Sequence, residues 1–445
     1  MDLKDSLSYA LDRASKLGAN KVEGAINESE KKELNIEAGK MSLFRTTFQN
    51  SLSIEAIKDN KQGSISINKI DKNSIDNSIE LLMNNVKSSQ PDKDNDISEK
   101  QDSEVFNKGS VASDLNLMYD KLDEFNDYVQ TQHKKIILEA AILDHTSNTS
   151  HIMNTNGVDF QVNKGIYNFS PMFTAKDGEK TSSFNYTYFS ALELSEKIQN
   201  KSYVSELLYQ AEEQVNTFPI KEKFVGTIIV TPHCLPEFLS FIQNSISDTA
   251  IISGTSIYKD RIGSKIANKN FNLSSSPLDK NLASGYFVTA DVYKAKNIDI
   301  IKDGILQTHL LSLYGANKTG GKRIANGGGA HIISKGSESF KNMIKNIDRG
   351  ILLCRFSGGY PTDGGDFSGV AKNSYYIENG EIKHPVIETM ISGNISDMFL
   401  NINNISNENI NFGDRILPWI AFNGITISWF LEQKLYIIYS SLQPS

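Results

Sequence analysis

The segment 232–237 (PHCLPE) brings together residue types that could bind a metal ion. Imidazole, thiolate and carboxylate groups are the usual protein ligands of zinc, and a catalytic zinc site holds three of them around one open position. His233 and Glu237 are four residues apart, the spacing of neighbours on one face of a helix. Pro236 lies between them, where we expect it to disrupt that helix. Residues 238–247 contain no histidine, so the second imidazole is missing.

A distant histidine, His309 or His331, could join His233 and Cys234 in a metal site. Lone histidines and buried free cysteines are common in proteins without any ligand role. We therefore predict no metal ion and no catalytic residue in this chain. The metal candidates that we keep are His233, Cys234 and His331.

A relocated metal site is the alternative, built from Asp363, Asp366, His331 and His384 in the later part of the chain. Carboxylates that cap turns and imidazoles that face solvent are the more ordinary interpretation of these residues. The metal content of protein purified without a chelator separates the two interpretations.

The two cysteines, Cys234 and Cys354, form no disulfide framework, so we expect free thiols in a reducing cytosol. Cys354 follows the apolar run 351–353, which is typical of a buried strand, and a buried thiol without a neighbouring cation is inert. Arg355 comes next, but the alternation of side chains along a strand places it on the opposite face. We predict no cysteine nucleophile.

Glycine-rich loops follow one another in the second half of the chain. Arg323 stands where a nucleotide-binding P-loop requires serine or threonine, and residues 327–329 (GGG) do not complete GxGxxG. Glycine permits close backbone approach and positive φ angles. These glycines either shape turns, which is the commoner case, or lie in loops that line a cleft, and contact of such loops with a peptide is a hypothesis. The predicted cleft residues are Gly320, Gly321, Asn326, Gly327, Gly328, Gly358, Gly359, Asp366, Phe367 and Ser368.

The candidate residues named above are positioned by helices and strands that the sequence pattern predicts. Apolar residues recur at helical spacing in four ranges, 3–17, 75–86, 115–129 and 191–215. Alternating segments lie between them, and the Asn-Gly within 154–157 predicts a hairpin turn. After residue 226, short strand-like runs alternate with glycine loops. The pattern predicts an α+β fold, with an N-terminal half of helices and antiparallel strands and a β-rich C-terminal half with glycine-rich loops.

Changes in composition divide the chain into five predicted units. They are an N-terminal α+β domain (1–87), a polar linker or exposed loop (88–104), a middle α+β region (105–219), a C-terminal β-rich domain (220–428) and an apolar tail (429–445). The tail must be buried somewhere to keep the protein soluble. It would add an element at a subunit interface or reflect a shift of the reading frame.

The 445 residues include 46 basic and 53 acidic side chains, which gives a net charge of −7 without a basic stripe. This balance argues against nucleic-acid binding, which relies on clustered Lys and Arg. No apolar run is long enough to cross a bilayer, and the first residues lack the apolar region of a secretory signal. We expect a cytoplasmic protein without nucleic-acid or membrane partners.

Three stretches of the second half form a distinctive combination. They are 375–395 (with YYIENGEI, HPV and ISGNI), 364–369 (GGDFSG) and 314–326 (with YGANK and RIAN). Together with the helix that ends at Gly18 and the 154–157 turn, they resemble the TldD/PmbA family of peptidase-related proteins, also known as modulators of DNA gyrase. The resemblance covers nearly the whole chain, and its most specific part is 375–395.

The resemblance implies a two-part architecture, in which an N-terminal α+β half precedes a C-terminal half of β-sheet around a cleft, and a role in proteolysis. TldD-type members carry a HExxxH helix that binds a metal together with a late cysteine, whereas PmbA/TldE-type members lack this set. This sequence has neither the motif nor a cysteine after Cys354, so it resembles the PmbA/TldE type. The resemblance implies zinc only in a TldD-type partner, with which the chain trims unfolded or precursor peptides. A self-contained metallopeptidase and a homodimeric peptide-binding module remain as alternatives.

Overall fold

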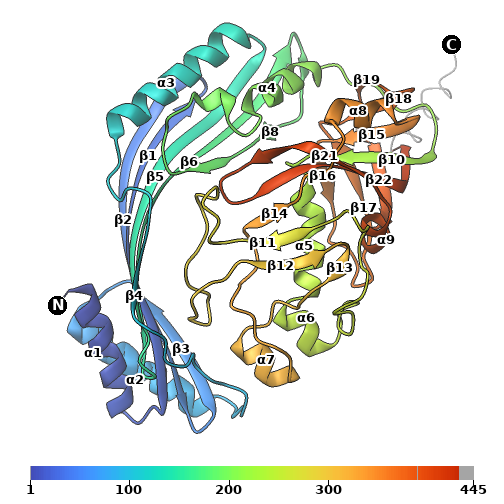
Figure 1. The fold of residues 1–445 in the computed structure, drawn as a ribbon. Helices are drawn as coiled ribbons and strands as arrows, with labels where there is room; N and C mark the ends of the chain where they lie inside the picture. Colours follow the sequence, from blue (N-terminus) through green and yellow to red (C-terminus); the bar gives the residue numbers. More distant parts are fainter. Residues whose placement is uncertain (1, 388, 430–445) are drawn as a thin grey trace, which may run out of the picture.

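Two large β-sheets organise the chain in the computed structural model, which describes residues 2–387 and 389–429. The predicted α+β class is confirmed, because helices pack on both sheets (Figure 1). Of the predicted apolar tail, Trp429 is the last residue of a strand, and residues 430–445 lie outside the described part of the chain.

The N-terminal sheet has the strand order β3-β2-β1-β5-β6-β4, and three short strands add to β6. Its strands are β1 (Lys21–Glu37), β2 (Lys40–Lys58), β3 (Lys61–Ile67), β4 (Glu104–Lys108), β5 (Ile136–Asn154), β6 (Asp159–Asp177), β7 (Lys180–Thr181), β8 (Asn185–Tyr186) and β9 (Phe189–Ala191). Pairing is antiparallel except between β4 and β6. The sheet therefore joins strands from both sides of the segment 88–104, while the division into five units stays a prediction.

Helices cover the two ends of the long N-terminal strands (Figure 1). They are α1 (Leu3–Lys16) and α2 (Lys72–Ser88) at one end, and α3 (Leu115–Gln132), the 3-10 helix η1 (Ile198–Asn200) and α4 (Val204–Glu213) at the other. Each end has its own apolar core, with Leu7 and Ile79 in the first and Phe125 and Phe169 in the second. The long strands thus hold two cores together without one continuous interior.

The hairpin predicted at 154–157 is confirmed, since it connects β5 to β6. The Oδ1 atom of Asn154 accepts hydrogen bonds from the amides of Asn156 and Val158 at 3.1 and 3.0 Å. Gly157 has a φ of +100°, which favours glycine. Local turn chemistry therefore fixes this connection.

The helix predicted over 191–215 is wrong, because only α4 and η1 are helical there. Ser202 and Tyr203 take positive φ angles of 48° and 65°, which end any continuous helix. The Oγ atom of Ser202 donates to the carbonyl of Asn411, and its carbonyl accepts from His233 Nε2 at 3.2 Å. Contacts with the C-terminal half thus override the local pattern.

The C-terminal sheet is built around β22, which pairs with β10, β14, β20 and β21. Its strands are β10 (Phe224–Val230), β11 (Leu273–Ser275), β12 (Ile298–Lys302), β13 (Ile305–Leu306), β14 (His331–Ile333), β15 (Arg349–Leu353), β16 (Arg355–Gly358), β17 (Asp366–Lys372), β18 (Tyr375–Glu378), β19 (Glu381–Pro385), β20 (Thr389–Asn394), β21 (Ile402–Asn411) and β22 (Ile416–Trp429). The helices are α5 (Leu235–Ser245), α6 (Asp248–Ser253), α7 (Leu313–Thr319), α8 (Phe340–Lys345) and α9 (Ile395–Leu400).

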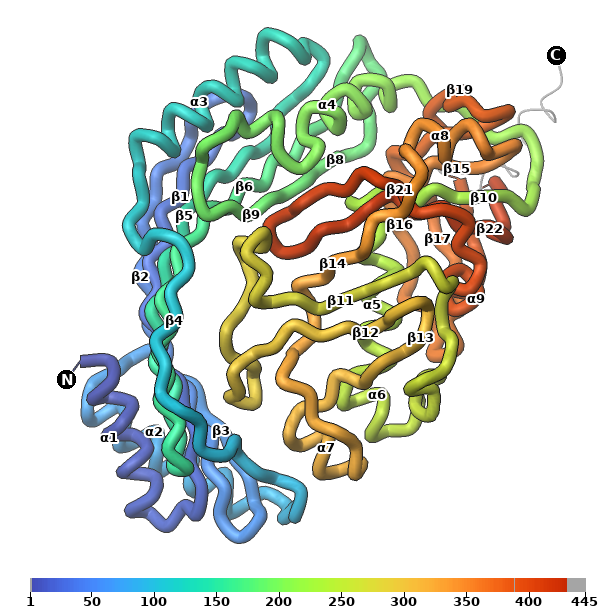
Figure 2. The backbone as a smooth tube through the Cα atoms, in the orientation of Figure 1, coloured from blue at the N-terminus to red at the C-terminus, as the bar shows by residue number. Residues whose placement is uncertain are grey.

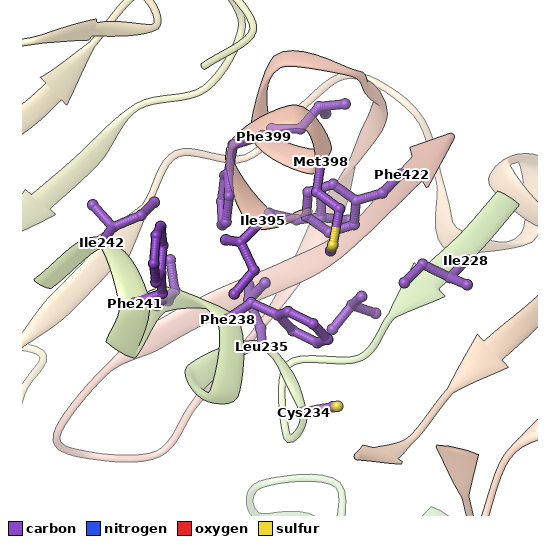
Figure 3. Packing of buried hydrophobic residues seen from close by; sticks show 14 of the residues in the cluster. Ile228, Cys234, Leu235, Phe238, Phe241, Ile242, Ile395, Met398, Phe399 and Phe422 are labelled. Atoms are coloured by element: carbon purple, nitrogen blue, oxygen red, sulfur yellow. The ribbon is translucent and has the colours of Figure 1, made fainter. Parts of the chain in front are cut away.

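The helix α5 supplies the centre of the C-terminal core. Leu235, Phe238, Leu239 and Ile242 recur at helical spacing, and each is at most 2% exposed. Figure 3 shows Leu235, Phe238 and Ile242 close to labelled residues of α9 and to Phe422 of β22. The apolar face of α5 is thereby committed to packing.

The segment 88–104 connects the halves physically. It has little regular structure, but it is not exposed throughout, because Ile97 and Ser98 are buried. Lys318 Nζ of α7 lies 2.8 Å from an oxygen of Asp92, and Figure 2 shows the segment passing close to α7. The Gln101 side chain donates to the Val292 carbonyl at 2.9 Å. The segment therefore acts as an ordered strap across the two halves.

No helix in residues 2–387 and 389–429 combines the length and the apolar character that crossing a membrane requires.

A pH-dependent stability is expected from Glu23, which lies opposite Glu55 between β1 and β2. Burial raises the pKa of Glu23 to about 7 from 4.5, although Asn154 and Ser98 donate to its carboxylate. A raised carboxyl pKa means that the folded state holds its proton more tightly, so stability falls as the pH rises from 4.5 to about 7. We expect a loss of about 2 kcal/mol in the free energy of unfolding between pH 5 and pH 8.

Urea denaturation of the wild type and of Glu23→Gln at both pH values tests this expectation. The glutamine side chain does not titrate, so the variant should lose much less stability than the wild type. Glu179→Gln, at an exposed position, is the matched control and should behave like the wild type. Equal pH dependence in wild type and Glu23→Gln would contradict the assignment.

Candidate functional site

A cavity with a volume of about 70 Å³ lies where the two halves meet. Residues 185–188 and Leu207 of α4 line it from the N-terminal half. The C-terminal half contributes the segment that leads into α5, residues 354–356, and Phe412 and Arg415 at the junction of β21 and β22. The cavity therefore depends on five chain segments that are distant in sequence.

Arg355 is the distinctive group of this lining. Its guanidinium carbon lies 3.2 Å from the centre of the Tyr186 ring, a stacked cation–π contact. Its Nη1 atom donates one long hydrogen bond of 3.4 Å to Asn185 Oδ1. Burial lowers the pKa of Arg355 to about 10, and the group remains charged at neutral pH. In the described part of the chain, no carboxylate forms an ion pair with it.

Asn185 carries a second unused donor. The residue is 2% exposed, and its Nδ2 atom has no hydrogen-bond partner among the described residues. Its Oδ1 atom accepts from the amide of Tyr186 at 3.0 Å as well as from Arg355. Because two donors fix the orientation of the amide, the nitrogen is the atom left unpaired.

Arg415 differs from Arg355 because it is neutralised. Its Nη2 atom lies 2.7 Å from Asp414 Oδ2, and the hydroxyl of Tyr188 donates to the same carboxylate at 2.9 Å. His331 lies near this pair, and burial lowers its pKa to about 4 while its Nε2 atom has no partner in the described chain. The unpaired positive charge of the cavity is therefore that of Arg355.

The metal candidates His233 and Cys234 both line the cavity, but they are held by protein contacts. The Nε2 atom of His233 lies 3.1 Å from Thr187 Oγ1 and 3.2 Å from the carbonyl of Ser202. Burial lowers the pKa of His233 to about 4, raises that of the Cys234 thiol and raises that of Cys354 to about 12. Both thiols are therefore protonated and unreactive at neutral pH.

Pro236 does not disrupt a helix, contrary to the sequence prediction. It lies in the first turn of α5, where the missing amide hydrogen has no intrahelical partner to lose. Cys234 is the N-cap and His233 precedes it, so His233 and Glu237 are not neighbours on one helical face. The spacing of four residues is therefore no metal-binding motif here.

The donor set as a whole does not fit a metal ion. Within the described residues, no group of three or more His, Cys, Asp and Glu side chains is arranged to hold one. His309 Nε2 lies 2.9 Å from the carbonyl of Tyr258, and His384 Nδ1 lies 3.1 Å from that of Pro385. Asp363 is exposed, and Asp366 accepts from Asn394. The residues proposed for a relocated site are thus dispersed.

The predicted cleft residues lie outside the cavity that Arg355 lines, which we call the arginine cavity. Gly320 is the C-cap of α7, with a φ of +69°, and Gly321 follows it. Gly327 and Gly328 follow Asn326, while Gly358 is the last residue of β16 and Gly359 follows it. Asp366, Phe367 and Ser368 belong to β17, and Phe367 is a core residue. Their role in contacting a peptide stays a prediction.

The helix α5 links two of these loops to the cavity. Its first turn lines the cavity, and its Gln243 Oε1 accepts from the amide of Gly329 at 3.2 Å. Its Phe241 packs against Gly365, in the loop between β16 and β17. One rigid helix therefore positions both glycine loops relative to Arg355.

Sequence reasoning missed Arg355 and Asn185. The strand is interrupted at Cys354, between β15 and β16, so Cys354 and Arg355 both line the cavity and the predicted opposite orientation is wrong. A single arginine that ends a buried apolar run was the available signal. For Asn185 no local signal exists, because its unpaired nitrogen depends on the fold.

Comparison with known proteins identifies relatives over the whole chain. A family model described as PmbA/TldA metallopeptidase C-terminal domain matches residues 224–429. The metalloprotease PmbA of Escherichia coli O157:H7 is 36% identical over 189 residues, 39% of this chain and 41% of that protein, so this match spans about two fifths of the relative. The metalloprotease PmbA homolog of Haemophilus influenzae is 23% identical and covers 95% of this chain and 96% of its own.

The fold is also that of a solved relative. The crystal structure of TldE from Thermococcus kodakarensis superimposes with a TM-score of 0.85 at 18% identity, over 95% of this chain and all of that one. The resemblance noted in the sequence is therefore confirmed. Residues 224–429 match the PmbA/TldA metallopeptidase C-terminal domain, and the chain as a whole is similar to PmbA in sequence and to TldE in fold.

Proposed function

We propose that this chain is a non-catalytic subunit that works with a TldD-type metalloprotease on unfolded or precursor peptides. The observation that carries the proposal is that α5 has apolar side chains, and not metal ligands, in a chain similar to this peptidase family. Where a HExxxH helix would present its ligands, α5 presents Phe238, Leu239 and Ile242 to the core. The zinc that supports hydrolysis would then belong to the partner.

The relatives described above favour a second candidate function, because two of them are named metalloproteases. A self-contained peptidase would need a metal site, and the donors described above do not fit one. Two buried free thiols and the absence of a basic stripe support a reducing cytosol as the compartment. A homodimer of the same fold would use equivalent surfaces, so we include it in the test.

We expect the purified chain to cleave no unfolded peptide alone, and to do so when mixed with a TldD-type protein. The expected gain over that protein alone is at least about tenfold, because a shared chamber adds binding to a complete catalytic site. Size-exclusion chromatography of the mixture and metal analysis of each component accompany the assay.

Each other outcome has a defined meaning. Nearly one zinc per chain together with chelator-sensitive cleavage by this chain alone would establish the self-contained peptidase. A stable homodimer that binds peptide and never associates with a TldD-type protein would establish the peptide-binding module. A mixture that behaves as the sum of its parts would overturn the subunit proposal.

A further inference from the structure

We propose that the cavity at Arg355 is a binding site for a peptide carboxylate. This inference rests on the proposed function for the identity of the ligand as a peptide. The site itself rests on Arg355 and Asn185, which both present unused donors to one cavity.

The guanidinium group is arranged for an anion. Five N–H donors surround its plane, and one of them makes a single long hydrogen bond. The Tyr186 ring covers its face, which leaves the edge that carries the donors available. A buried charge without a partner is costly, so a bound anion would offset a cost already present in the fold.

A second donor, the side-chain amide of Asn185, would orient a bound carboxylate. Asn185 Nδ2 is buried and unpaired on the same lining as the guanidinium group. A carboxylate accepts about four hydrogen bonds through its two oxygens, so it can use the guanidinium fork and this amide together. The first turn of α5, an eleven-residue helix, also lines the cavity and contributes its positive dipole end.

The charges favour a carboxylate over a phosphate. Arg415 is neutralised by Asp414, so Arg355 provides one unpaired positive charge. Glu237 is exposed on the same lining and would repel a doubly charged group more strongly than a singly charged one.

The surroundings favour a peptide as the bearer of that carboxylate. Asn185 belongs to β8, which pairs with β6, and Arg355 belongs to β16, which pairs with β17. In the described part of the chain each of these strands has one unpaired edge, and such edges accept extended peptides. Phe184 and Tyr186 are 59% and 54% exposed beside the cavity and offer apolar contact to neighbouring peptide side chains.

Calorimetric titration of the full chain with three N-acetylated tetrapeptides tests the site. The first has a free C-terminal carboxylate, the second is amidated and carries one glutamate, and the third is amidated and neutral. We expect the first or the second to bind at least about tenfold more tightly than the third. If only the first peptide binds tightly, the ligand is a terminal carboxylate. If only the second binds tightly, the ligand is an acidic side chain. If both bind tightly, the site accepts a carboxylate in either position.

Variants locate the binding. Arg355→Gln should lower the affinity for the carboxylate peptide at least about tenfold, and Asn185→Ala several-fold, whereas the exposed control Arg261→Gln should leave it unchanged. Arg355→Gln should also melt close to the wild type, because the loss of the contact with Tyr186 is offset by the removal of a half-buried charge that has no ion-pair partner in the described chain. If Arg355→Gln fails to fold, Asn185→Ala carries the test.

Equal binding of all three peptides, no binding of any, or full affinity in Arg355→Gln or Asn185→Ala would overturn the site. These results concern the isolated chain, so they are independent of cleavage with a TldD-type protein. A functional mixture without carboxylate binding would reject this inference alone, and carboxylate binding without a functional mixture would reject the subunit proposal alone.

Discussion

Replacing Phe238 by alanine is expected to lower the free energy of unfolding of the C-terminal half by about 3–5 kcal/mol. Phe238 is 1% exposed at the centre of α5. Its ring centroid lies 5.5 Å from that of Phe356 and 5.4 Å from that of Phe367. Removing the ring loses its transfer free energy and leaves a cavity that three secondary-structure elements cannot close by small shifts.

Tryptophan fluorescence is the measurement of choice for this prediction. Both tryptophans, Trp419 and Trp429, belong to β22, so their signal reports the C-terminal half even if the halves unfold in separate steps. Urea titrations compare the wild type, Phe238→Ala and the control Phe48→Ala, whose ring is 72% exposed. A loss below about 1 kcal/mol in Phe238→Ala would show that α5 is not packed as described.

Asn326→Ala is the second large change, with an expected loss of about 3 kcal/mol. Asn326 is 4% exposed, and its Nδ2 atom donates to the carbonyls of Ser275 and Lys296 at 3.2 and 2.7 Å. Its Oδ1 atom accepts from Ser275 Oγ, Tyr286 Oη and the amide of Gly328. Alanine leaves several of these buried groups unpaired, and each costs about 1–3 kcal/mol.

The same titration measures this variant, and Asn281→Ala is its control, because Asn281 is exposed and its Nδ2 atom donates to Asp279 Oδ1 at 2.9 Å. Limited proteolysis adds a local readout. We expect faster cleavage within residues 320–330 of Asn326→Ala, since the amide fixes the loop that carries Gly327 and Gly328. Unchanged proteolysis and stability would contradict the role of Asn326 as the loop's anchor.

Elements fixed by local chemistry were predictable from the sequence. The helix α1 has apolar residues at helical spacing and ends before Gly18, which has a φ of +95°. The 154–157 turn follows from its Asn and Gly residues. The prediction of a helix over 191–215 was wrong because Ser202 forms hydrogen bonds with Asn411 and His233, which lie in the other half of the molecule. Such distant partners leave no trace in a local pattern.

The candidate site was predictable only in part for the same reason. His233 is held by Thr187 and the carbonyl of Ser202, and the structural role of His233 and Cys234 stays a prediction, while the argument from Pro236 was wrong. The role of Arg355 depends on residues 185–188, which line the same cavity. A charge can be recognised as unpaired only after every neighbour is known, and those neighbours come from five separate segments.

Because both thiols are buried, the rate at which a reagent labels them reports transient opening of the junction between the halves. Cys234 and Cys354 are 2% and 4% exposed, and both line the arginine cavity. A thiol reagent can modify them only when α5 or the start of β16 moves away from its neighbours. The rate of labelling in native buffer therefore measures how often the junction between the halves opens, without any engineered probe, and a ligand that holds the junction closed would slow it.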